Sequence, residues 1–316
     1  MDQLTSPPAA PPLNIPPVMT VEAAADAQRF LVLGEQANLW FEGQADVLII
    51  SFDNLATIDE GWPRGPWFLQ RLTAMGYSVL GVQSHAKDWF RAPTAPDLLR
   101  KLEETGFFRR FRKVVMIGAS MGGFSALNFA PLIPEARVLA FSPQSTMNKR
   151  IAPFEARFPF AVRKSNWEDI AFLDAAAAVP YIRKVTLLYD PFVVEDKAHA
   201  ERLSGPNVQL LRVPHCTHEA IRVVLKSGAV QGLIRAIVED DVVGPQFWVD
   251  FRARKSVAKW QRALLAELIT RKHPKLAIRA ADAIVRRADG IPDGDLAFAR
   301  RAKRSALAAI KADGKG

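Results

Sequence analysis

Residues 114–125 read Val-Val-Met-Ile-Gly-Ala-Ser-Met-Gly-Gly-Phe-Ser and contain the G-x-S-x-G pentapeptide Gly118-Ala119-Ser120-Met121-Gly122. Four apolar residues precede this motif, and an apolar segment compatible with a helix, residues 124–130, follows it. A strand, a sharp turn and a helix in this order would hold the serine in a strained conformation with its hydroxyl above the sheet. The small glycines let the strand and the helix pass close to each other. The motif therefore marks Ser120 as a candidate nucleophile.

Apolar runs and helical patterns alternate on both sides of this motif. The predicted strands are Arg29–Gly34, Ala37–Phe41, Asp46–Phe52, Ser78–Gln83, Lys113–Ile117, Arg137–Ser142, Lys184–Tyr189 and Val208–Val213. Several of these runs are rich in β-branched residues and almost continuously apolar, which is typical of strands buried on both faces of a parallel sheet. Helical patterns lie between most of them: Trp67–Met75, Pro96–Glu104, Gly122–Ala130, Asp196–Leu203 and Glu219–Lys226. The alternation predicts an α/β fold with a doubly wound, mostly parallel sheet of about eight strands.

The composition is that of a chain with a sizeable core. Of the 316 residues, 49% are hydrophobic, which is ample for a packed interior. No stretch approaches the roughly 18 uninterrupted apolar residues of a membrane-spanning helix, and the first residues lack the pattern of a secretory signal. The single cysteine, Cys216, cannot form an internal disulfide. We therefore expect a cytoplasmic protein.

Charge is spread unevenly and suggests how the chain is organised. Residues 251–316 contain 17 Lys and Arg against 6 Asp and Glu, whereas residues 1–250 contain 25 and 27. We expect a Pro-rich flexible leader over residues 1–28, an α/β domain over 29–250 and a basic helical extension over 251–316. Residues 147–180 interrupt the alternation and are either a cap insertion over the catalytic edge or an irregular connection whose aromatic residues join the core. Arg150, Arg157 and Arg163 in this segment suggest a cap that receives an anionic acyl or sugar group.

The extension reads as two or three amphipathic helices broken at Pro274 and at the Gly290–Gly294 turn. Its cations could contact an acidic surface, such as nucleic acid, an acidic lipid layer or an acidic partner protein. The alternative is a solvated helical face whose apolar side packs on the sheet domain. In either case we expect the basic surface to be separable from the chemistry of Ser120.

A serine hydroxyl needs a base within hydrogen-bond reach and a third group that orients the base. The strand run 185–189 ends at Asp190, and the run 208–213 is followed by the segment Pro214-His215-Cys216-Thr217-His218-Glu219. Asp190 is the expected acid, with Asp196 on the same loop as its rival. His218 is the expected base, with His215 as the alternative. We expect His85 and His199 to lie at the surface or behind the residues that carry the chemistry.

The chain here resembles the α/β-hydrolase superfamily, over roughly residues 29–240. The G-x-S-x-G motif around Ser120, a tight strand-to-helix turn called an elbow, carries most of the resemblance. Asp190-Pro191-Phe192-Val193 resembles the family's strand-end Asp-x-x-Val motif, and Thr217-His218-Glu219-Ala220 resembles its histidine motif. The resemblance implies a serine hydrolase that acts on a small-molecule ester or thioester through an acyl-enzyme. The segment Phe141-Ser142-Pro143-Gln144 is similar to bacterial enzymes of polysaccharide acyl transfer, so the alternatives are an acyltransferase to a sugar or alcohol, or a non-catalytic binding protein that acts through its basic tail.

The tetrahedral intermediate of acyl transfer needs two N–H donors. The expected donors are the backbone N–H groups of Met121 and Asp53, with Phe52 or Asn54 as alternatives to Asp53. The chain departs from the family here, since the loop 51–54 contains no glycine, and an acidic side chain at position 53 must point away from the developing charge. No cofactor and no metal is expected: His215, Cys216 and His218 are three candidate ligands without the second cluster that a structural zinc site requires.

Overall fold

The computed structural model describes residues 13–287 and 296–313. Residues 1–12 of the predicted Pro-rich leader and the whole of the predicted Gly290–Gly294 turn lie outside the described residues. Within those residues, eight strands form one sheet in the order β1-β2-β4-β3-β5-β6-β7-β8. The strands are β1 (Arg29–Leu33), β2 (Ala37–Glu42), β3 (Val47–Phe52), β4 (Ser78–Ser84), β5 (Lys113–Ala119), β6 (Arg137–Phe141), β7 (Lys184–Tyr189) and β8 (Val208–Arg212).

The sheet is mostly parallel, as predicted. Strand β2 is antiparallel to both of its neighbours, β1 and β4. The other neighbouring strands pair in parallel. All eight predicted strands are confirmed, with boundaries that differ by at most two residues. Parallel strands bring their carboxyl ends to one edge, so the loops after β3, β5, β7 and β8 meet there.

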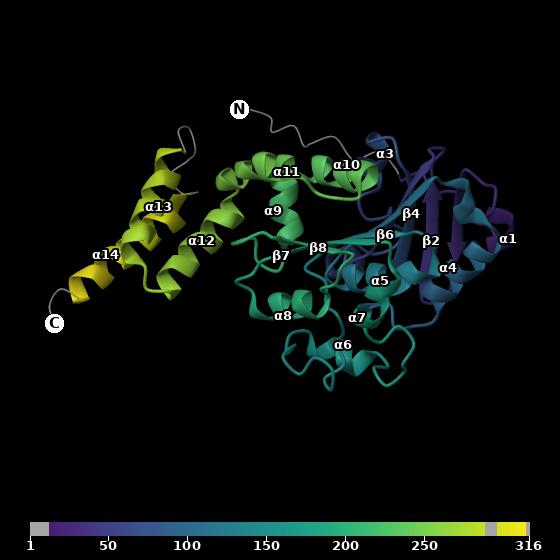
Figure 1. Ribbon diagram of the computed structural model, residues 1–316, viewed down its shortest axis with the longest axis horizontal. Helices are drawn as coiled ribbons and strands as arrows, with labels where there is room; N and C mark the ends of the chain where they lie inside the picture. Colours follow the sequence, from purple (N-terminus) through teal and green to yellow (C-terminus); the bar gives the residue numbers. More distant parts are fainter. Residues whose placement is uncertain (1–12, 288–295, 314–316) are drawn as a thin grey trace, which may run out of the picture.

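Helices cover both faces of the sheet (Figure 1). Those that precede the C-terminal extension are α1 (Val21–Ala24), α2 (Leu55–Ile58), α3 (Leu69–Ala74), α4 (Thr94–Glu104), α5 (Met121–Phe129), α6 (Pro159–Lys164), α7 (Ala175–Ala178), α8 (Val194–Arg202), α9 (Ala220–Lys226), α10 (Val230–Asp240) and α11 (Pro245–Asp250). Short 3₁₀ segments span Phe107–Arg110, Ala130–Leu132, Val179–Tyr181 and Phe251–Ser256. The five helices predicted in this part of the chain are confirmed, as α3, α4, α5, α8 and α9.

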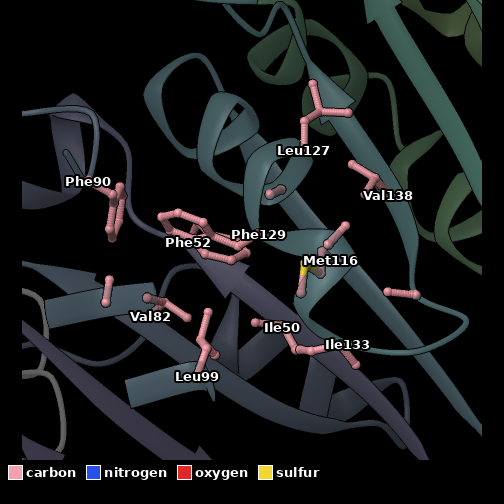
Figure 2. Close-up of a cluster of buried hydrophobic side chains, with 14 of the residues drawn as sticks. Ile50, Phe52, Val82, Phe90, Leu99, Met116, Leu127, Phe129, Ile133 and Val138 are labelled. Carbon is pink, nitrogen blue, oxygen red and sulfur yellow. The ribbon is translucent and has the colours of Figure 1, made fainter. Parts of the chain in front are cut away.

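The two faces of the sheet bury two separate clusters. Side chains of β3 alternate between them: Leu48, Ile50 and Phe52 belong to one cluster, while Val47 and Ile49 belong to the other. Figure 2 shows part of the first cluster, in which Phe52 lies beside Phe129 of α5. The second cluster lies beneath α3, α9, α10 and α11. This alternation, with period two along a central strand, is how one sheet supports a doubly wound fold.

The C-terminal extension contains three helices in its described part, α12 (Ala258–Thr270), α13 (Pro274–Arg286) and α14 (Ala297–Asp313). Figure 1 shows them at the opposite end of the molecule from α1. They have a small core of their own: Leu265, Ala281, Ile284, Leu296, Ala299 and Ala302. None of the described helices combines the length and the apolar character needed to cross a bilayer.

Candidate active site

Ser120 lies at the turn between β5 and α5 with φ 52° and ψ −116°. A non-glycine residue with positive φ is strained, and such strain is concentrated at functional sites. The motif's glycines make this turn possible. A Cβ on Gly118 would come within 2.1 Å of the Gly122 carbonyl oxygen, and a Cβ on Gly122 would come within 2.6 Å of the Asp53 carbonyl oxygen. The elbow predicted from the sequence is therefore present in its full geometry.

Ser120 and His218 are in direct contact. Ser120 Oγ lies 2.9 Å from Nε2 of His218, and Nδ1 of the same ring lies 2.8 and 3.0 Å from the two carboxylate oxygens of Asp196. Asp196 is 2% exposed and belongs to the first turn of α8. With Nδ1–H donating to the carboxylate, Nε2 is free to accept the serine proton. This is the arrangement that activates a serine for nucleophilic attack.

The expected contact between Asp190 and His218 is not found. The Asp190 carboxylate accepts hydrogen bonds from the backbone N–H groups of Phe192 at 3.0 Å and Thr217 at 2.7 Å. Asp190 directly follows the last residue of β7, and its short side chain bonds the backbone of the following loop in an Asx turn. Asp196, the alternative acid named from the sequence, lies further along the chain, and its carboxylate reaches the imidazole. The structure thus brings together Ser120, His218 and Asp196, and leaves Asp190 in a separate contact.

The other histidines lie away from Ser120. His215 is stacked on Phe192, with 4.7 Å between ring centroids, and meets the edge of Trp260; burial lowers its pKa. His85 is exposed and donates to the Glu35 carbonyl. Burial raises the pKa of the Cys216 thiol, which keeps the thiol protonated. Among the described residues, no group of three or more His, Cys, Asp and Glu side chains is arranged to hold a metal ion.

Arg157 connects the segment 147–180 to Asp196 and His218. Its Nη1 lies 2.9 Å from Asp196 Oδ1 and 3.4 Å from His218 Nδ1. Its Nε and Nη2 donate to Glu155, whose side chain is fully buried. Glu155 was not identified from the sequence, and Arg157 was expected to receive an anionic group rather than to contact Asp196, because this segment has no periodicity that reveals which side chains point inward.

Glu155 also accepts a hydrogen bond from His199 Nε2 at 3.1 Å. The Ser145 backbone N–H donates to His199 Nδ1, so Nε2 carries the proton. Burial lowers the pKa of His199, and the neighbouring Glu155 only partly opposes this. Burial would raise the pKa of Glu155, but the bonds from His199 and Arg157 outweigh it and lower that pKa to about 2. His199 is therefore a buried neutral residue behind Asp196, in line with one of its two expected locations.

Gln144 also contacts Ser120, and was not identified from the sequence as a site residue. Its side chain is fully buried, and Nε2 lies 3.2 Å from Ser120 Oγ. The indole N–H of Trp89 donates to Gln144 Oε1 at 3.1 Å. Because this bond fixes the amide oxygen as an acceptor, the amide nitrogen is the group that donates to the serine oxygen.

The N–H groups available to an oxyanion differ in part from those expected. Met121 is the first residue of α5, so its N–H has no acceptor within the helix. The N–H of Asp53 donates to the Val82 carbonyl at 3.2 Å, and that of Asn54 donates to Thr57 Oγ1 at 2.9 Å. The Asp53 expectation is therefore contradicted, since its N–H is already used in holding the loop to β4.

The Asp53 side chain points away from Ser120, as the sequence argument required. Asp53 Oδ2 pairs with Arg64 Nη2 at 2.6 Å and accepts from the Ser84 N–H at 3.1 Å. Phe52 is the last residue of β3 and is paired with β4. In the described part of the chain, the Leu55 N–H has no acceptor, and Leu55 lines the cavity beside Ser120. The Leu55 N–H is therefore a candidate donor, one position beyond the residues named from the sequence.

A cavity of about 430 Å³ opens beside Ser120 and His218. Its apolar walls are Leu55, Ala56, Trp67, Ala119, Phe158, Ile221 and Leu225. Of the segment 147–180, only Phe158 lines it. Arg150 pairs with Glu168 at the surface, Arg157 is held by two carboxylates, and Arg163 is exposed. The cap arginines therefore form no anion pocket here, contrary to the expectation from the sequence.

Comparisons with known proteins give remote structural similarity only. No family model matches the chain, and no curated protein matches it in sequence. Among solved structures, the chain is similar to an esterase of Pyrococcus furiosus (16% identity, 70% of this chain and 96% of that one, TM-score 0.42). It is also similar to the capsule O-acetyltransferase of Neisseria meningitidis serogroup A (11%, 65% and 93%, 0.44) and to a putative esterase of Staphylococcus aureus (13%, 69% and 85%, 0.45).

The fold of this chain can be assigned from its own features. The strand order places β2 antiparallel between β1 and β4, and the remaining strands run parallel. The serine elbow follows β5 at the centre of the sheet, and the residues that contact it follow β7 and β8. This sheet and this elbow have the arrangement of the α/β-hydrolase fold.

Proposed function

We propose that this protein is a serine hydrolase that cleaves an ester or thioester through an acyl-enzyme intermediate. The observation that carries the proposal is the unbroken series of contacts from Ser120 Oγ through His218 to the Asp196 carboxylate. Such a series lowers the cost of removing the hydroxyl proton as the serine attacks a carbonyl carbon.

In the proposed reaction, Ser120 Oγ attacks the carbonyl carbon while His218 Nε2 takes its proton. Asp196 stabilises the imidazolium that forms and keeps Nδ1 protonated. The N–H groups of Met121 and Leu55 donate to the oxyanion. His218 then gives the proton to the leaving oxygen or sulfur, and the acyl-enzyme remains. A water molecule, activated by the same imidazole, releases the acid and restores Ser120.

The cavity favours a substrate with an apolar group next to the ester. Five large apolar side chains line it, namely Leu55, Trp67, Phe158, Ile221 and Leu225. Burying such a group there contributes roughly 25 cal/mol for each Å² removed from water. The charged residues on the wall are Glu60, Glu219 and Arg222, and the last two pair with each other. We therefore expect neutral acyl esters to be better substrates than anionic ones. An alcohol in place of water would make the same site an acyltransferase.

Labelling with a fluorophosphonate probe tests the proposal. The wild-type protein should be labelled, whereas Ser120→Ala and His218→Ala should not. Ser204→Ala and His85→Ala are matched controls, since both residues are exposed and their hydrogen bonds go to the Glu201 and Glu35 carbonyls rather than to Ser120, His218 or Asp196; both variants should label like wild type. Hydrolysis of p-nitrophenyl butyrate and p-nitrophenyl succinate should favour the neutral ester. A folded wild-type protein that fails to label contradicts the proposed function.

A further inference from the structure

We propose that the C-terminal extension is part of the catalytic unit, because Lys259 and Trp260 of α12 are positioning residues for the loop that carries His218. This inference rests on the proposed function of Ser120 and His218. It replaces the expectation that the basic extension is separable from the chemistry. Asp190, which follows β7, contacts the same loop through the Thr217 N–H.

In the loop between β8 and α9, residues 214–219 include two with an unfavourable backbone conformation. His215 and Thr217 have φ values of 64° and 61°. Neither is glycine, and Thr217 is β-branched, so both occupy a sparsely populated backbone region. Such a conformation persists only where surrounding contacts impose it. His218 directly follows Thr217, so the position of the base depends on those contacts.

Helix α12 supplies contacts to both ends of the loop. The indole N–H of Trp260 donates to the Pro214 carbonyl at 2.9 Å, and the ring meets His215 edge to face at 5.8 Å. Lys259 forms an ion pair with Glu219, the residue that follows His218. Trp260 is 9% exposed, so its hydrogen bond is shielded from water. Both side chains come from the first turn of the helix.

Asp190 holds the middle of the same loop. Its carboxylate is 2% exposed and accepts the Thr217 N–H at 2.7 Å, directly before the base. Its other oxygen accepts the Phe192 N–H, and the Phe192 ring is stacked on His215. The guanidinium of Arg271, just beyond the end of α12, lies over the Phe192 ring, 4.6 Å from its centroid. The loop is thus held between the β7 loop and the extension.

Packing alone predicts a different result from positioning. Trp260 and Val257 also belong to the cluster beneath α9–α11, so a purely structural extension would act through stability. A positioning role acts on the distance between His218 Nε2 and Ser120 Oγ, where a misplacement of about 1 Å can cost about 100-fold in rate. Trp260→Phe separates the two roles, because phenylalanine keeps most of the buried ring but cannot donate to Pro214.

The test uses the full-length protein with Trp260→Phe, Lys259→Met and Lys259→Arg. Arg262→Met is the matched control, since Arg262 lies on the same helix and its guanidinium packs over Phe298 within the extension. We expect Trp260→Phe and Lys259→Met to lower kcat for p-nitrophenyl butyrate by about tenfold with KM nearly unchanged. Lys259→Arg should restore kcat to within about twofold of wild type, because it keeps the charge.

The outcomes separate this inference from the proposed function. If wild-type protein labels with the fluorophosphonate but Trp260→Phe and Lys259→Met keep wild-type kcat, the positioning role is rejected and the proposed function stands. A loss of kcat that only accompanies a lowered unfolding temperature, and that Arg262→Met reproduces, also rejects the positioning role. Absence of labelling in the folded wild type rejects both.

Discussion

Replacing Asp196 by asparagine is the sharpest test of how the site is arranged. The carboxylate lies 2.8 and 3.0 Å from His218 Nδ1 and is almost completely buried. The substitution keeps the size of the side chain but removes its negative charge. Arg157 Nη1 lies 3.4 Å from the imidazole. In the transition state the guanidinium and the imidazolium are both positive, and the variant has no carboxylate to offset their repulsion.

The size of the effect follows from the charge that forms during attack. In the transition state His218 becomes an imidazolium. Two opposite charges about 4 Å apart attract by about 4 kcal/mol at an effective dielectric constant of about 20. Each 1.4 kcal/mol corresponds to about a factor of ten in rate. Asp196→Asn should therefore lower kcat about 1000-fold, with little change in KM.

Steady-state hydrolysis of p-nitrophenyl butyrate and the rate of fluorophosphonate labelling measure this loss. Asp190→Asn is the comparison, because Asp190 was the acid expected from the sequence. Its amide can still accept one of the two backbone N–H groups that Asp190 now binds, so its kcat should fall only about tenfold, as a positioning residue's would. If Asp190→Asn lost more activity than Asp196→Asn, with both proteins folded by circular dichroism, the assignment of the acid and the reasoning from the contacts would be refuted.

Two further predictions concern stability. Gly122→Ala should lower the free energy of unfolding by about 1–3 kcal/mol, because its Cβ would lie 2.6 Å from the Asp53 carbonyl oxygen and 2.8 Å from that of Phe52. The control is Gly244→Ala, where no atom lies within 4 Å of the added Cβ, and it should be close to neutral in urea titrations. Equal unfolding midpoints for the two variants would contradict the close approach at Gly122. Acid should also destabilise the protein: since the pKa of His199 is lowered from 6.5 and that of Glu155 from 4.5 to about 2, the unfolded chain binds more protons as pH falls from about 6.5. Glu155→Gln should flatten the part of this dependence below pH 4.5, whereas Glu168→Gln, in an exposed pair with Arg150, should follow wild type; an unchanged slope in Glu155→Gln would show that Glu155 is not held ionised.

The sheet and the turn that carries Ser120 could be predicted because their signals are local. Buried parallel strands are continuous apolar runs, and the elbow needs small residues at Gly118 and Gly122 whatever the rest of the chain does. The contact of His218 with Ser120 could be predicted for a similar reason, since His218 occupies the junction between a strand loop and a helix. These features depend on a few neighbouring residues.

The acid and the oxyanion loop depend on where side chains and N–H groups turn, which the sequence does not record. Asp190 is captured by the backbone of Phe192 and Thr217, and the N–H groups of Asp53 and Asn54 by Val82 and Thr57. Arg157 and Glu155 reach Asp196 only through the folded path of residues 147–180. One sequence signal could have linked Asp196 with His199: the two residues are three apart and thus share a face of α8. The domain boundaries, the acidic partner of the tail and the cytoplasmic location stay predictions.

Helix α12 belongs to two hydrophobic cores at once. Trp260 packs into the cluster of the sheet domain, whereas Leu265, little more than one turn later, packs against α13 and α14. Local opening of the α13–α14 pair would leave the first turn of α12 anchored while its later turns lose their cover. Amide hydrogen exchange along this one helix should therefore change from slow to fast between its beginning and its end, and it would report how far the opening of the C-terminal hairpin reaches toward the sheet domain.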